Sequence, residues 1–312
     1  MNAYPSEATA PGAAVFLPDG SARAYREWRA RKLDERPDDP VELLVPLERS
    51  DRLTPEERAR ILDALRRCNM ALYQLPEAGE SKADLLARNR ALGLRHLDGN
   101  LCSDEDKVTS LQVDDSGRKR YYIPYTNRRL VWHTDGYYNE PSRQIHAFVL
   151  HCVRPAARGG ESWLLDPDLV YIHLRDTDPR MVEALFHPQA MTIPPNIENG
   201  IEIRGARTGP VFSLLPDGRL HMRYSARTRN IEWRDDPATC EAEACIRAYL
   251  DAGDSPAYHH RLMSGQGVIC NNVLHARTGF EDDARAGGGR LLYRARYYDA
   301  IPVFDQNMIK VV

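Results

Sequence analysis

The chain has 312 residues, of which 42% are hydrophobic and 28% charged, so it can bury a sizeable core. Its formal net charge of −3 excludes the strong basic excess of a general nucleic-acid-binding protein. No apolar run approaches the roughly 20 residues of a membrane helix, and no N-terminal signal pattern occurs. Six cysteines without a C-x-x-C pair favour a reduced chain, so we expect a cytoplasmic protein with no membrane span.

The N-terminal part predicts an irregular arm followed by helices and one strand. Residues 1–45 are rich in Pro, Ala, Arg and Asp, with one short helix expected near Ala24–Lys32. Thr54 precedes Pro and two Glu residues, a capping-box pattern that predicts the start of a helix. Met70–Leu75 is typical of a strand, and Ser81–Leu92 of a second helix that stops at Gly93.

After about residue 105, aromatic and β-branched stretches separated by Pro, Gly and Asp predict a β-rich region. Helices are expected within Pro167–Leu185 and from Pro237 to about Ala252. We therefore expect one domain over residues 46–312, mainly β with flanking helices. The expected strands are Arg120–Pro124, Ile145–Val153, Ser162–Leu165, Val211–Leu215, Leu220–Tyr224, Gly267–Asn271 and Leu291–Tyr298.

The triplet His133-Thr134-Asp135 is a candidate metal-binding motif. Residues i and i+2 of a strand point to the same face, so this imidazole and carboxylate can bind one ion side by side. A second histidine from a later strand would complete a 2-His-1-carboxylate face, the ligand set of non-haem iron(II) oxygenases. His96-Leu97-Asp98 has the same pattern, but it follows a predicted helix and precedes a polar run, which indicates a loop histidine.

His275 is the candidate distal ligand, because it lies in a late apolar segment and a pair of arginines follows it. Arg290 and Arg294 share one face of the last predicted strand by the same period of two. A guanidinium is a natural partner for a carboxylate, so these arginines favour a carboxylate-bearing ligand. The alternative is a pair of surface arginines at the end of a strand.

Taken together, the ordered motifs resemble the TauD/TfdA family of iron(II)- and 2-oxoglutarate-dependent dioxygenases. The resemblance covers roughly residues 105–300 and rests on Trp132–Gly136, Gly159–Ser162, Leu274–Thr278 and the Arg290/Arg294 pair. It implies a double-stranded β-helix (jelly-roll, cupin-like) core. It also implies an enzyme that uses Fe(II), 2-oxoglutarate and O2, hydroxylates or otherwise oxidises a small-molecule substrate, and releases succinate and CO2.

The resemblance also assigns roles to individual residues. It implies that His133, Asp135 and His275 bind the iron. Ser162 and Arg290 match the family's partners for the 2-oxoglutarate carboxylate, and Arg294 is placed to contact either 2-oxoglutarate or an anionic substrate. The Gly-rich stretch Ala286–Gly289 leaves open which of the two arginines holds 2-oxoglutarate.

The substrate pocket is expected around the residues that flank the H-x-D motif. The basic run from His221 to Arg229 favours an anionic substrate such as a sulfonate, a carboxylate or an acidic sugar such as Kdo, unless it is only a solvated basic face. The expected pocket residues are Trp132, Tyr137, Tyr138, Asn139 and Arg223.

Two other functions use the same ligands. One is a cupin-type zinc or manganese hydrolase or isomerase, and the other is a non-catalytic 2-oxoglutarate-binding protein. Arg290 with Ser162 argues against the hydrolase, which needs no carboxylate clamp, and the intact ligand triad argues against the non-catalytic protein. The sequence leaves the substrate and the oligomeric state open, and a homo-oligomer is compatible with it.

Overall fold

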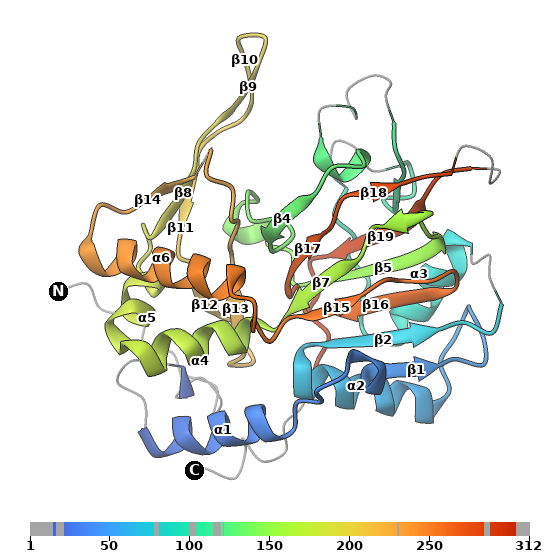
Figure 1. The fold of residues 1–312 in the computed structure, drawn as a ribbon, viewed down its shortest axis with the longest axis horizontal. Coiled ribbons are helices and arrows are strands. Elements are labelled where there is room, and N and C mark those ends of the chain that lie inside the picture. The colour runs from blue at the N-terminus through green and yellow to red at the C-terminus, as the bar shows by residue number, and fades with distance from the viewer. Residues whose placement is uncertain are drawn as a thin grey trace.

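The computed structural model describes residues 15–16, 22–77, 81–99, 104–114, 120, 122–229, 231–283 and 288–303. Strands dominate this part of the chain, and several helices cover them, which confirms the expectation of a mainly β fold (Figure 1). No helix in the described ranges is long and apolar enough to cross a membrane.

The largest sheet has six strands in the order β1-β2-β16-β5-β19-β3. Only β1 and β2 are parallel, and every other neighbouring pair is antiparallel. The last strand of the described residues, β19, lies inside the sheet, between β5 and β3, rather than at its edge. The strands are β1 (Leu44–Pro46), β2 (Met70–Gln74), β16 (Gln266–Cys270), β5 (Ala147–Arg154), β19 (Leu291–Tyr297) and β3 (Thr109–Leu111).

A second, four-stranded sheet has the order β15-β7-β17-β4. Its strands are β15 (Tyr258–His260), β7 (Ser162–Leu165), β17 (Leu274–Arg277) and β4 (Leu130–His133). The ring of Phe148 on β5 lies 4.5 Å from that of His275 on β17, so the two sheets meet at this point.

Shorter strands extend this framework. β8 (Met191–Ile193) pairs with β11 (Arg207–Gly209) and β14 (Glu232–Trp233), and the hairpin of β9 (Asn196–Glu198) and β10 (Ile201–Arg204) projects from them (Figure 1). The other two pairs are β12 (Phe212–Leu214) with β13 (Leu220–Met222), and β6 (Arg158–Gly159) with β18 (Phe280–Glu281).

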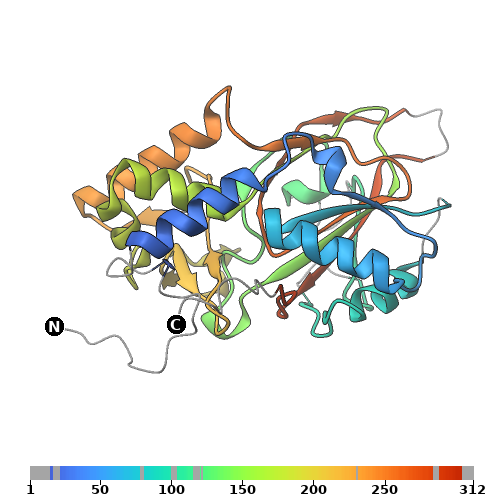
Figure 2. The same cartoon turned by 90° about the horizontal axis from the view of Figure 1, so that it is seen from below.

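The helices begin where their capping residues predict. Thr54 and Glu57 form the expected capping box of α2 (Pro55–Cys68), and Ser81 caps α3 (Lys82–Arg90). Asp166, Asp178 and Asp236 cap α4 (Pro167–Thr177), α5 (Pro179–Phe186) and α6 (Pro237–Asp251). α2 packs on the six-stranded sheet, whereas α1 (Ala22–Asp34) lies along the helices α4 to α6 (Figure 2).

Most expected elements are confirmed, with one clear exception. Instead of a strand over Arg120–Pro124, residues Ile123–Tyr125 form a 3₁₀ turn in which the N–H of Tyr125 donates to the carbonyl of Tyr122. Pro124 has no N–H for a strand ladder, which favours the turn. Residue 121 lies outside the described residues. Two further 3₁₀ turns, Pro40–Leu43 and Pro141–Arg143, were not expected.

The helix expected near Ala24–Lys32 is present as α1 and packs against the rest of the described structure. Tyr25 and Trp28 of α1 are buried in the same apolar cluster as helices α4 and α6. Lys32 is also buried, and its Nζ lies 2.6 Å from Asp166 and 2.7 Å from Asp168. A buried ammonium is stable only when its charge is compensated, so this ion pair fixes α1 against the start of α4.

Replacing Lys32 by Met is expected to lower the free energy of unfolding by about 3–5 kcal/mol, because it leaves two buried carboxylates without their cation. Urea titration followed by circular dichroism would measure the change. Arg29→Ala is the matched control on the same helix, since the exposed Arg29–Asp176 pair should contribute less than about 1 kcal/mol. Equal effects of the two substitutions would contradict this account.

Candidate active site

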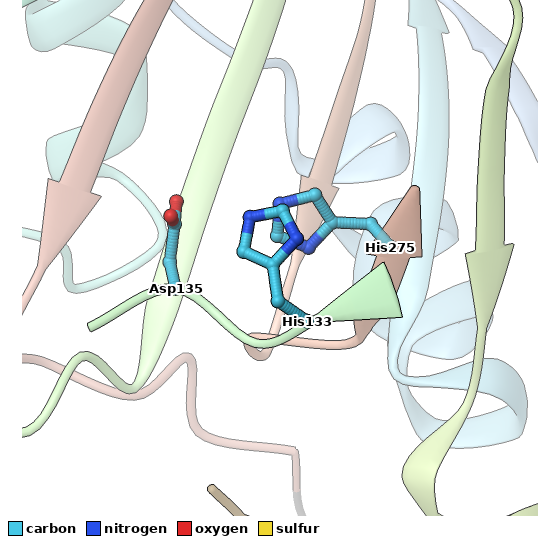
Figure 3. A group of neighbouring side chains, drawn as sticks. All are labelled: His133, Asp135 and His275. Atoms are coloured by element: carbon cyan, nitrogen blue, oxygen red, sulfur yellow. The ribbon is translucent and has the colours of Figure 1, made fainter. Parts of the chain in front are cut away.

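Three side chains that could hold a metal ion converge between the two sheets. One ligand atom from each of His133, Asp135 and His275 lies within 4.8 Å of the others, and all three residues are buried. The two imidazole centroids are 4.2 Å apart, and the carboxylate of Asp135 faces them (Figure 3). The structure thus brings together the two parts of the sequence that supplied the candidate ligands.

Strand register explains this convergence. His275 on β17 is directly opposite His133 on β4, and residues opposite each other in an antiparallel pair share a face. Asp135 follows the end of β4, where Gly136 has a φ of 68° and a Cβ would lie 2.4 Å from Ile145 Cγ1. Only glycine fits this turn, which directs Asp135 back toward the histidines.

Asn272 holds the Asp135 loop in place. Its Oδ1 accepts a hydrogen bond from the N–H of Asp135 at 2.8 Å, and its Nδ2 donates to the carbonyls of Asp135 at 3.0 Å and Ile145 at 2.6 Å. Asn272 lies two residues before β17 and has a φ of 45°. The segment that carries His275 therefore also positions Asp135.

Each histidine is oriented by a backbone carbonyl. Nδ1 of His133 lies 2.9 Å from the carbonyl of Val131, and Nδ1 of His275 lies 3.1 Å from that of Val273. An Nδ1–H that donates to a carbonyl leaves Nε2 as the free nitrogen for a metal. Burial, together with the other histidine, lowers the pKa of His133 to about 3, and burial also lowers the pKa of His275, so both rings are neutral at pH 7.

Asp135 is ionised at neutral pH although it is buried. Burial by itself would raise the pKa of this carboxyl group, but Arg294 and Arg296, together with the two histidines, outweigh it and lower the pKa below its ordinary value. Its Oδ2 is buried and accepts no hydrogen bond from the residues the structure describes. A neutral histidine pair beside an ionised carboxylate with an unused oxygen fits a divalent cation.

A buried ion-pair network lies next to Asp135. Arg294 Nη1 is 3.4 Å and Arg296 Nη1 is 3.7 Å from Asp135 Oδ1. Arg296 also forms an ion pair with Asp98 and donates to the hydroxyl of Tyr138, while Asp98 accepts a hydrogen bond from Tyr298. The network therefore contains two guanidinium groups and two carboxylates.

Ser162 and Arg290 lie together, as expected from the sequence. Both line a small pocket with Cys152, Gly160, Arg261 and Leu292. On β7, Leu164 is opposite His275 and Ser162 is two residues away, so the hydroxyl lies on the face that carries the metal ligands. Arg290 is buried, and burial lowers its pKa to about 10, so its guanidinium remains charged at neutral pH.

Of the residues expected around the substrate, the two tyrosines lie at the site. The ring of Tyr137 lies 6.3 Å from that of His133, and the ring of Tyr138 lies 5.2 Å from that of Tyr137. Asn139 is occupied locally, because its Nδ2 donates to the carbonyl of Arg143. The structure does not bring Asn139 into contact with the metal ligands.

Trp132 and Arg223 contact the protein's own core and backbone rather than an open substrate pocket. Trp132 alternates with His133 along β4, is buried in the cluster beneath the helices, and packs 6.1 Å from Trp163. The guanidinium of Arg223 donates to five backbone carbonyls. With its five donors occupied, Arg223 has none left for a substrate anion, so this geometry does not support the expected contact.

Three residues beside the candidate ligands were not expected from the sequence: Asp98, Arg296 and Asn272. Arg296 lies two residues beyond Arg294 on β19, so the period-two argument used for Arg290 and Arg294 also applied to it. His96 is exposed, as expected for a loop histidine, but Asp98 of the same triplet is buried and contacts Arg296. No local pattern signals Asn272.

Asp98→Asn is expected to weaken metal binding about tenfold. Loss of a residue that supports a metal ligand typically lowers metal affinity about 10- to 100-fold, and this value is at the lower end of that range. Without the carboxylate of Asp98, Arg296 turns its charge toward Asp135 and competes with the cation. Competition with a chromophoric chelator would measure the affinity. His96→Ala, which changes the exposed histidine of the same triplet, should leave it unchanged, and an unchanged affinity in Asp98→Asn would contradict this role.

Known proteins share sequence similarity with this chain. Residues 35–296 match the family described as taurine catabolism dioxygenase TauD, TfdA family. Two relatives are named uridine-5'-phosphate dioxygenase. The one from Amycolatopsis sp is 34% identical over 54% of this chain and 61% of its own length, and the one from Streptomyces sp is 31% identical over 64% and 73%. The chain thus spans less than two thirds of the first relative.

Solved structures share the fold. An asparagine oxygenase in complex with Fe(II), 3-hydroxyasparagine and succinate superposes with a TM-score of 0.51, at 20% identity over 80% of this chain and 85% of that one. The non-haem iron oxygenase OrfP in complex with Fe and α-ketoglutaric acid gives 0.54, at 17% identity over 78% and 82%. The family match covers most of the sequence, and the chain therefore belongs to the TauD/TfdA family of iron(II)- and 2-oxoglutarate-dependent dioxygenases.

Proposed function

We propose that this dioxygenase hydroxylates a small anionic organic substrate in a double-stranded β-helix core, with succinate and CO2 as coproducts. In this proposal His133, Asp135 and His275 hold Fe(II), and Ser162 and Arg290 hold the distal carboxylate of 2-oxoglutarate. The observation that carries the proposal is the buried triad, in which one ligand atom of each residue lies within 4.8 Å of the other two.

The triad matches the chemistry that the family requires. Two neutral histidines and one carboxylate leave coordination positions open for other ligands, as non-haem iron(II) oxygenases need. Bound iron(II) would supply the coupling of 2-oxoglutarate decarboxylation to activation of O2. The protein's part is to position the three ligands and to exclude water, and both sheets and the Asn272 contacts support this positioning.

The neighbouring pocket supports Arg290 rather than Arg294 as the main partner of the distal carboxylate. Arg290 and Ser162 line the same pocket, whereas Arg294 is directed to Asp135, one of the proposed metal ligands. Arg294 is thus better placed to contact the end of 2-oxoglutarate that would bind the metal than its distal carboxylate. A guanidinium and a hydroxyl are together suited to bind a carboxylate.

An anionic substrate is supported by the relatives and by the charge around the site. Both relatives carry the name of a phosphorylated nucleoside as their substrate. Arg204 and Arg227 interact electrostatically with Tyr137, whose ring lies beside His133. This positive charge on the substrate side of the metal favours a negatively charged substrate.

The first test is the absorption spectrum of anaerobic protein mixed with Fe(II) and then with 2-oxoglutarate. A weak metal-to-ligand charge-transfer band should appear only after both additions, because both must bind at one site. His133→Ala should abolish the band, and His96→Ala, the histidine of the other H-x-D triplet, should retain it. A folded, iron-loaded protein without a band would refute the assigned ligands.

Arg290→Gln is expected to raise the KM for 2-oxoglutarate about tenfold to a hundredfold, as loss of a charge-assisted hydrogen bond predicts. Succinate formation at varied 2-oxoglutarate concentrations would measure it. Arg158→Gln is the control, because it removes the same charge from an exposed position on neighbouring β6. A larger increase in Arg294→Gln than in Arg290→Gln would reverse the assignment of the two arginines.

A further inference from the structure

The segment after β13 extends the four-stranded sheet beyond β4. The N–H of Thr134 donates to the carbonyl of Tyr224 at 3.0 Å, and the N–H of Ala226 donates to the carbonyl of Trp132 at 2.8 Å. Between these bonds, Ser225 is directly opposite His133 in an antiparallel bridge. Since opposite residues share a face, Ser225 faces the same side as the metal ligand.

Arg227 follows Ser225 by two residues, and its N–H donates to the Ser225 hydroxyl at 3.4 Å, so Arg227 begins next to the residue that is opposite His133. Its position near the site has independent support from Tyr137. The side chain of Tyr137 is hydrogen-bonded to Ser225 and interacts electrostatically with Arg227. The ring of Tyr137 in turn lies 6.3 Å from that of His133, so Arg227 approaches the metal ligands from the β4 side.

Arg204, the last residue of β10, approaches the same tyrosine. Its guanidinium donates to the carbonyls of Pro194 and Gly205, which orient it without neutralising its charge. Burial, with a further contribution from Arg207, lowers the pKa of Arg204, while Tyr137 and Tyr138 partly oppose this effect. Two positive side chains from distant parts of the sequence therefore converge on Tyr137.

Other arginines around the site have partners, and Arg227 has none among the residues that the structure describes. Arg207 pairs with Glu140 at 2.7 Å, Arg223 donates to carbonyls, and Arg296 pairs with Asp98. Arg227 is half-buried, and it forms no ion pair with a carboxylate of the described residues. A partly buried guanidinium without a carboxylate partner, next to a second cation, is stabilised when an anionic ligand binds to it.

The order of strands separates this position from the 2-oxoglutarate pocket. Ser162 is on β7, His275 on β17 and His133 on β4, and Arg227 follows on the extending segment. Adjacent strands are about 5 Å apart, so Arg227 and Ser162 lie on opposite sides of the metal ligands. An anion held by Arg227 is therefore distinct from the cosubstrate carboxylate.

We propose that Arg227, assisted by Arg204, binds the phosphate of a phosphorylated substrate and thereby determines which molecules are oxidised. This inference rests on the proposed function, because it assigns the substrate side of that same metal site. Two guanidinium groups suit a dianionic phosphate monoester, which accepts several charge-assisted hydrogen bonds at once.

The test measures binding of uridine-5'-phosphate and of uridine to the anaerobic protein loaded with Fe(II) and 2-oxoglutarate, by isothermal titration calorimetry. The wild type should bind the phosphate ester at least about tenfold more tightly than uridine. Arg227→Gln should remove most of this preference, and Arg227→Lys should keep part of it. Arg229→Gln, an exposed change of equal charge in the same segment, should behave as the wild type does.

The charge-transfer band and the KM for 2-oxoglutarate separate the possible failures. Arg227→Gln should leave both unchanged, since it lies across the metal from the cosubstrate. A wild type with the band but no preference for the phosphate ester overturns the phosphate subsite alone, as does an Arg227→Gln protein that keeps the preference. A wild type without the band overturns the proposed function itself.

Discussion

The buried negative charge of Asp135 is the constraint on which the rest of the site depends. A carboxylate in a protein interior must be compensated, and here the compensation comes from Arg294 and Arg296 of the opposite sheet. Arg296 in turn requires Asp98, because a second unpaired guanidinium would be as unfavourable as the first carboxylate. The carboxylate of Asp135 thus forms the ion pairs that link the two sheets, and the same carboxylate is available to bind a metal.

Charge balance also links the cosubstrate to the substrate. The two carboxylates and two guanidinium groups around Asp135 are formally neutral together. A divalent cation would add two positive charges and dianionic 2-oxoglutarate would remove them, which leaves the charge of Arg290 on the β7 side. An anionic substrate on the β4 side would therefore need positive charge of its own, and in the proposed phosphate subsite Arg227 and Arg204 would supply it, whereas the guanidinium of Arg223 is occupied by backbone carbonyls.

The sequence predicted those features that depend on short-range periodicity. Capping residues mark α2 and α6, and the i, i+2 spacing pointed to His133 and Asp135, although Asp135 lies in the turn after β4 rather than on the strand. The pairing of Asp98 with Arg296 was not predictable, because these residues are 198 apart in the sequence and only the fold brings them together. Arg223 was misjudged because a basic run does not reveal whether carbonyls or solvent surround each guanidinium. The short strands β8 to β11 have too few residues for an alternating pattern.

The position of β19 has a consequence for how the protein forms. This strand is the last among the described residues, yet it pairs with β5 on one side and β3 on the other. A nascent chain that has not yet emerged beyond residue 290 has a gap in its largest sheet and lacks both arginines that compensate Asp135. The ligand loop and its countercharges can therefore meet only after residues 291–297 have been synthesised and have paired with β3 and β5.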